Sequence, residues 1–249
     1  MVLTAGAQTP SPGVPPPTPR PAGQGRPGGI GQPGGAPGAA GSGRAGNMFT
    51  RVDDHTYTVG QIRIDTQKRE LVVPGRVNDA STLEFVANPR GGAKAYESAI
   101  TIDGNAVIFN AALLLLGLDP ARSRVPVKQF DPIPPQGDPV EITVTLPGGR
   151  RVPIEDLIYD TRTKKSLKPG PWVYTGSTFV DRGQGRQFLA QIDGVVIGLM
   201  HGPQALIDNP RNDTMGAFGY LVLNPNLGLK PDAPVTLTIR ALDRSTPTK

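Results

Sequence analysis

The side chains in this sequence that could do acid–base or nucleophilic chemistry are few, because the chain has no cysteine and only two histidines. His201 is the more informative histidine: it follows an apolar run that predicts a strand and precedes Gly202-Pro203, a position where strand ends and loops often carry function. Glu97, Ser98 and Asp208 are the polar residues that could act with it. A hydrolase or a metal-dependent enzyme would use His201 with Glu97 or Asp208. However, the sequence around Ser98 is not that of a nucleophile elbow.

No metal or cofactor site is expected from the remaining motifs. The lack of cysteine excludes disulfides, iron–sulfur clusters, thiolate zinc sites and cysteine nucleophiles. His55 follows Asp53-Asp54, but a second group of ligands that would complete a coordination shell is missing. Residues 23–28 have the letters of a dinucleotide-binding loop, yet a Gly/Pro tract supplies neither the strand before it nor the helix after it.

Residues 1–47 differ in composition from the rest of the chain. They hold 13 Gly, 10 Pro, three Arg and no acidic residue. Such a segment cannot bury enough apolar surface to offset the roughly 1–2 kcal/mol per residue that ordering costs, so we predict a disordered tail. Residues 48–249 are predicted to form a single β-rich domain.

The formal net charge of +5 does not indicate a nucleic-acid partner. Three of the 26 Lys and Arg lie in the tail, which leaves 23 against 21 Asp and Glu in residues 48–249. A dense basic stripe with interleaved aromatics, which would follow a phosphate backbone, is absent from the sequence. The most apolar run, residues 106–118, is shorter than the roughly 20 residues that a membrane span needs.

The first residues leave two interpretations of cellular location open. Val2-Leu3-Thr4 followed by Ala5-Gly6-Ala7 is similar to the end of a signal peptide's apolar segment and its cleavage site, although the basic region and most of the apolar core are missing. In one interpretation the start lies inside a longer export signal, which predicts a periplasmic or secreted protein. In the other, these residues belong to the low-complexity tail.

Alternating apolar and polar residues predict strands with one wet face. Val140, Ile142, Val144 and Leu146 alternate with polar residues, and the same period recurs over residues 235–242. Two hairpins are also predicted. One pairs residues 57–64 with 70–73 and closes before Pro74-Gly75, and the other pairs 188–192 with 195–200 through a type I′ turn at Asp193-Gly194.

One helix is predicted over residues 106–116, with Asn105 as its N-cap and Gly117 at its end. The run is apolar on nearly all sides, which is typical of a buried helix, and Leu113, Leu114, Leu115 and Leu116 are expected at the centre of the core. A charge at Leu114 or Leu115 is therefore expected to unfold the domain. Trp172 is a further expected core residue.

These elements predict a mainly β, α+β fold. About eight to ten strands with one helix contain too little helix for a doubly wound sheet. The sequence favours a β-sandwich or a partly open barrel with one buried helix.

Several ordered segments resemble the YdjY-like domain family of bacterial envelope and lipoprotein-type proteins. They run from Val73-Pro74-Gly75 through Tyr96-Glu97-Ser98 and Trp172-Val173-Tyr174 to Ala205-Leu206-Ile207-Asp208, so the resemblance covers roughly residues 57–242. It implies an exported protein or lipoprotein without an established biochemical activity. The lipobox cysteine is missing, and the family offers no residue with an assigned role.

The sequence thus leads to three functional hypotheses. The first is a non-catalytic, extracytoplasmic module that binds an unidentified protein or small ligand in the envelope, with the tail as a spacer. The second is the His201-dependent enzyme described above. The third is a structural envelope component that self-associates through sheet edges.

Overall fold

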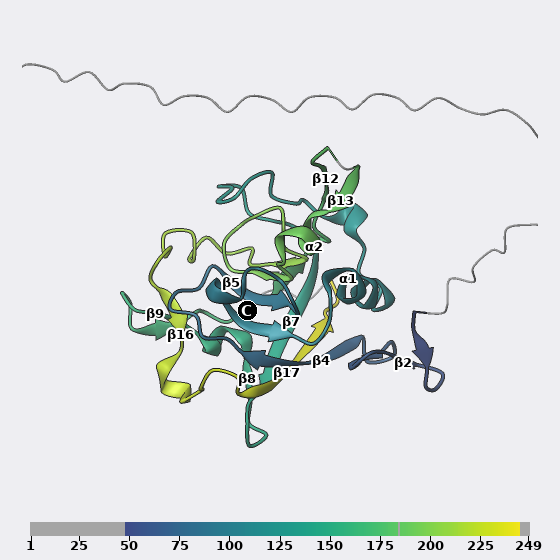
Figure 1. The fold of residues 1–249 in the computed structure, drawn as a ribbon, viewed down its shortest axis with the longest axis horizontal. Coiled ribbons are helices and arrows are strands. Elements are labelled where there is room, and N and C mark those ends of the chain that lie inside the picture. The colour runs from purple at the N-terminus through teal and green to yellow at the C-terminus, as the bar shows by residue number, and fades with distance from the viewer. Residues whose placement is uncertain (1–47, 184, 245–249) are drawn as a thin grey trace, which may run out of the picture. The chain divides into compact units, whose positions relative to one another are not determined.

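Eight strands close into a barrel in the computed structural model, which describes residues 48–183 and 185–244 (Figure 1). The predicted tail, residues 1–47, lies outside the described residues. The mainly β class is confirmed, but the sandwich and the partly open barrel are not. Following the hydrogen-bonded neighbours, the ring consists of β4 (Glu70–Val77), β17 (Pro234–Ala241), β7 (Asp138–Thr145), β11 (Trp172–Tyr174), β15 (Ile207–Asp208), β14 (Ile197–Gly198), β5 (Phe85–Pro89) and β6 (Ser98–Ile102), which pairs with β4 again.

The two runs with the clearest alternation form neighbouring strands. β7 and β17 pair antiparallel, with Val144 opposite Leu237 and Ile142 opposite Ile239. β4 pairs with the other side of β17 from Glu70, opposite Arg240, to Arg76, opposite Pro234. In β4, β17 and β7 inward side chains are buried and most outward ones are partly or fully exposed, so these three strands are called the exposed wall.

The other five ring strands are shorter and are called the covered wall. β11, β15, β14, β5 and β6 contain two to five residues each, and nearly all of their residues are buried on both faces. Loops and helices therefore cover their outer side. Two of the pairings in this wall, β14 with β15 and β5 with β6, are parallel.

The ring closes at Gly75, in the middle of β4. The first half of β4 pairs with β3 (Ile62–Asp65), and the second half pairs with β6, with Gly75 opposite Ile102. A Cβ at Gly75 would lie 2.7 Å from the carbonyl oxygen of Thr101, so only glycine allows this approach. The predicted end of the strand before Pro74 is wrong because β4 continues through Pro74-Gly75 to this closing pair.

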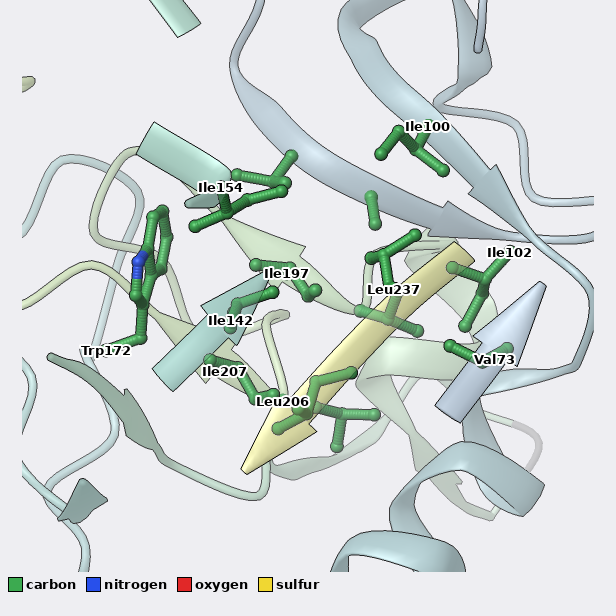
Figure 2. Close-up of a cluster of buried hydrophobic side chains, with 14 of the residues drawn as sticks. Val73, Ile100, Ile102, Ile142, Ile154, Trp172, Ile197, Leu206, Ile207 and Leu237 are labelled. Atoms are coloured by element: carbon green, nitrogen blue, oxygen red, sulfur yellow. The ribbon is translucent and has the colours of Figure 1, made fainter. Parts of the chain in front are cut away.

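The barrel interior is filled by side chains, as expected of an eight-stranded barrel. Figure 2 shows aliphatic side chains from both walls converging on one another, with Trp172 at the margin of the cluster. Trp172, Leu237 and Ile197 are each fully buried. The interior is thus a solid core.

The predicted helix forms as α1 (Ala106–Leu115), but it is not a buried plug. Asn105 accepts a hydrogen bond from the Ile108 amide, and Gly117 follows with a φ of 83°. Leu113 and Leu116 are buried, whereas Leu114 and Leu115 are 43% and 38% exposed. The expectation for Leu114 and Leu115 is wrong, because α1 lies outside the ring beside α2 (Leu189–Asp193) and buries only one face.

The hairpin predicted at Asp193-Gly194 is also wrong. Residues 189–193 form α2, and Gly194, with a φ of 68°, is its left-handed C-cap. The strand before it instead pairs backward, as β13 (Arg186–Phe188) with β12 (Phe179–Asp181).

The remaining elements are additions to the eight ring strands. β1 (Thr50–Arg51) and β2 (Thr56–Val59) extend the sheet beyond β3, and β8 (Arg151–Pro153) pairs with β7. β10 (Lys165–Ser166), β9 (Ile158–Asp160) and β16 (Leu221–Leu223) form a separate small sheet. The short 3₁₀ helices are η1 (Ala95–Glu97), η2 (Pro120–Arg122), η3 (Ile154–Leu157) and η4 (Pro225–Leu227).

Candidate functional site

His201 lies three residues beyond β14 of the covered wall and is completely buried. Its Nδ1 lies 2.9 Å from the carbonyl oxygen of Asp131, and its Nε2 lies 3.2 Å from the carbonyl oxygen of Arg211. A neutral imidazole can donate to only one of these oxygens, and the protonated ring donates to both. The ring therefore connects two loops, residues 124–136 and residues 209–220, and neither nitrogen faces solvent.

The first of these loops is closed on itself. An isolated β-bridge joins Arg124 to Gln136 at its base, and the Arg124 guanidinium donates to the carbonyl oxygens of Ile133 and Pro134 at 2.8 and 3.0 Å. The Asp131 carboxylate accepts the amides of Val127 and Ile133, and these hydrogen bonds, together with Arg124, hold the pKa of Asp131 below its usual range. The loop is a preformed unit.

Both loops present apolar side chains to solvent. Val127 is 80% exposed and Phe218 is 53% exposed. Phe130 has a φ of 57°, a left-handed conformation that bulky residues rarely adopt, and its ring meets Phe218 edge-on with centroids 5.3 Å apart. We call Val127, Phe130, Ile133 and Phe218 the loop patch. His201 lies beneath it as the link between the two loops.

Asp208 ends β15 and is also completely buried. Its carboxyl group accepts the Asn209 amide at 2.9 Å and the Gly202 amide at 3.3 Å. Burial raises the pKa of Asp208 well above its ordinary value. Gly198 makes room for the carboxyl group, since a Cβ there would lie 2.8 Å from Oδ1.

Glu97 and Ser98 lie elsewhere on the covered wall, at the junction of η1 and β6. The Ser98 hydroxyl donates to the Lys94 carbonyl oxygen at 2.7 Å, and the Glu97 carboxylate pairs with the Lys94 ammonium at 2.6 Å. Within residues 48–183 and 185–244, no hydrogen bond or ion pair joins either residue, or Asp208, to His201. The structure does not bring the four polar residues together as one site.

Sequence reasoning missed a second buried polar group beside these residues. Trp172 donates from Nε1 to the Glu155 carboxylate at 2.9 Å, and the Arg211 guanidinium lies over the indole, 5.2 Å from its centroid. Burial raises the pKa of Glu155 and lowers that of Arg211. Nothing local marks these three residues, because they come from separate parts of the chain and only the fold joins them.

Two further observations concern ions and membranes. Among the described residues, no three His, Asp or Glu side chains are grouped as a metal site. Asp53, beside His55, instead accepts the amides of His55 and Thr56 and so caps a turn. In the same part of the chain, no helix has the length and apolarity to cross a bilayer.

A family model described as the YdjY domain matches residues 62–240, which run from the start of β3 almost to the end of β17. The chain belongs to the YdjY domain family. Comparison with curated proteins and with solved structures gives no match. The match contains all eight ring strands apart from the last residue of β17, together with His201 and the loop patch. The closed barrel is therefore the YdjY domain of this chain, and the resemblance predicted from the sequence is confirmed.

Proposed function

We propose that this YdjY domain is a non-catalytic module that works outside the cytoplasm and binds a protein partner through the loop patch. The observation that carries the proposal is the pair of aromatic rings, Phe130 and Phe218, held at the surface by loops that the buried His201 ties together. Grouped exposed apolar side chains mark interaction sites, and aromatic residues dominate the energy of protein interfaces.

The backbone supports the same proposal. A left-handed conformation at a residue other than glycine costs on the order of 1–3 kcal/mol and persists where the surroundings impose it. At Phe130 the imposing contacts include the amide of Phe130, which donates to the His201 carbonyl oxygen at 2.8 Å. A patch that is already ordered loses less conformational entropy when a partner binds.

The burial of the polar residues supports the proposal that the module is non-catalytic. A general base must reach a substrate proton within hydrogen-bonding distance, and His201 is fully buried with both nitrogens facing carbonyl oxygens. Turnover of an ester, phosphate or glycan substrate by the purified chain, abolished by His201→Ala, would overturn this part.

In-cell photo-cross-linking tests the partner. A photoreactive phenylalanine analogue replaces Phe218 in the full chain, and we expect one discrete product larger than the chain, which is lost when Phe130→Ser is added. The same analogue at the exposed Lys165 of β10 is the control and should give no such product. A product that contains only two copies of this chain would overturn the proposal in favour of self-association.

The location is tested separately. Support for export comes from the resemblance to envelope proteins and from the pattern of Val2 to Ala7. Expressed from its own gene in its own cell, the protein should be digested by protease added to cells with a permeabilised outer layer. Protection equal to that of a cytoplasmic marker would contradict the proposed location.

A further inference from the structure

A groove of about 770 Å³ lies between two segments of the chain. One side is the turn between β7 and β8, residues 146–150. The other is the segment that leads from η4 into β17, residues 227–234. The groove shares no residue with the loop patch, so it is a separate feature.

The groove is lined mainly by apolar side chains. Leu146 is buried, Leu227, Leu229 and Ala233 are half-buried, and three prolines complete the lining. Its volume lies within the range of about 300–1,000 Å³ that is typical of small-molecule sites. An occupant of this groove would therefore bring an apolar body.

Charged side chains also line the groove. Arg150 lines it from the turn and Lys230 from the opposite segment, and within residues 48–183 and 185–244 neither has an ion-pair partner. In a hollow of about 350 Å³ beside Gly117, by contrast, Arg122 and Arg244 both pair with Asp138. With Asp232, which also lines the groove, the net charge of the lining is +1.

This charge argues against the chain's own tail as the occupant and for an anionic molecule. Residues 1–47 carry three arginines and no acidic residue, so they would add positive charge to a positive site. A molecule with one negative charge would neutralise the lining. A single alkyl chain would cover the leucines and prolines.

We propose that this groove binds a free, single-chain amphiphile with an anionic head, of the fatty-acid carboxylate class. The alkyl chain of the amphiphile lies along the leucines, and its carboxylate lies between Arg150 and Lys230. This site does not depend on the protein partner at the loop patch, and either proposal can fail alone.

Three probes with the same alkyl chain test whether the charge of the head group determines binding. Dodecanoate and dodecyltrimethylammonium are titrated into the full chain below their critical micelle concentrations, and dodecanol below its solubility limit. Binding is followed by calorimetry and by amide NMR shifts. We expect saturable binding of dodecanoate, about fivefold to tenfold weaker binding of dodecanol, and weaker binding still of the cation. Octanoate should bind at least about tenfold more weakly than dodecanoate. Equal binding of all three heads, or no saturable binding, would overturn the proposal.

Matched variants test whether dodecanoate binds in this groove. Arg150→Gln combined with Lys230→Gln should weaken dodecanoate binding about fivefold to tenfold and change dodecanol binding less than twofold. Arg151→Gln is the control, because the neighbouring Arg151 donates to Thr143 on the outer side of the exposed wall at 3.1 Å and does not line the groove. An equal loss from Arg151→Gln would contradict the site. All substituted residues are exposed, so the fold should be retained.

Vesicles separate the free amphiphile from a membrane surface. Vesicles that contain phosphatidylglycerol should not sediment the protein, because a concave groove binds a single alkyl chain from solution. Sedimentation that Arg150→Gln with Lys230→Gln abolishes would overturn the assignment to a free amphiphile.

Discussion

The exposed and covered walls of the barrel share one core but differ in what lies behind them. Behind β4, β17 and β7 there is largely water, and regular eight-residue strands with alternating side chains suffice. Behind β11, β15, β14, β5 and β6 lie loops and helices, and buried polar groups such as His201 and Asp208 connect these layers. Both walls bury side chains in the same core, but the ordered surface features, among them the loop patch, are built on the wall whose strands are short.

The largest effect is expected in the exposed wall. Leu237→Asp places a charge in the barrel core, where Leu237 is fully buried, and should leave no folded protein by circular dichroism. Thr236→Asp, one residue away on the outward face, should cost less than about 1 kcal/mol of unfolding free energy. Similar losses for the two variants would break the distinction between inward and outward positions.

Closure of the ring where the two walls meet gives the next effect. Gly75→Ala forces β4 away from β6 and should lower the free energy of unfolding by about 1–3 kcal/mol in urea titrations. Gly216→Ala is the control, because a Cβ there meets nothing within 4 Å. An unchanged midpoint for Gly75→Ala would show that the closing pair tolerates a wider spacing.

On the covered wall, His201→Ala should cost about 1–3 kcal/mol, because at least one of the carbonyl groups of Asp131 and Arg211 loses its buried hydrogen-bond donor. Hydrogen exchange should become faster in residues 124–136 and 209–220, whereas amides of β7 and β17 stay protected. Uniformly faster exchange would mean that His201 supports the whole barrel and not the two loops.

Asp208 makes the stability of the covered wall depend on pH. Because burial raises its pKa in the folded state above the ordinary 3.8, the folded protein binds a proton that the unfolded chain has released, and stability is lost as pH rises above 3.8. Asp208→Asn removes this contribution. As pH rises above 4, the wild type should lose free energy of unfolding relative to the variant in urea titrations. Parallel pH profiles for the two proteins would contradict a buried Asp208 carboxyl group with a raised pKa.

The smallest effect is expected on α1. Leu114→Glu changes an exposed side chain and should shift the free energy of unfolding by no more than about 0.5 kcal/mol. Leu113→Glu, at the neighbouring buried position, should unfold the domain. Thermal unfolding of both variants decides whether α1 buries one face or two.

How much the sequence could predict follows from the same two walls. Alternation located β7 and β17 with the correct inward residues, and the caps of α1 were correct, because a wet face and a helix end leave local signals. Strands buried on both faces leave no alternation, so β15 is not predicted, and β14 is predicted only within a longer strand, residues 195–200, with the wrong hairpin partner. Asp193-Gly194 fits a hairpin turn as well as a helix C-cap.

The candidate site divides in the same way. His201 was singled out by its place after an apolar run, but its partners are carbonyl oxygens at Asp131 and Arg211, which no side-chain pattern can announce. The prediction that Leu114 and Leu115 are core residues is wrong because an apolar sequence does not show which face of a helix is buried. Only the fold shows which face meets the ring.

The order of strands in the ring has a consequence for how the domain is made. β17, the last strand among the described residues, inserts between β4 and β7, so a nascent chain carries two unpaired strand edges until residue 241 has been synthesised. Such edges are templates for pairing with other chains, and contacts between distant segments form slowly. Folding of this barrel therefore follows synthesis of β17, and a polypeptide that lacks β17 is the form in which these edges can pair with other chains.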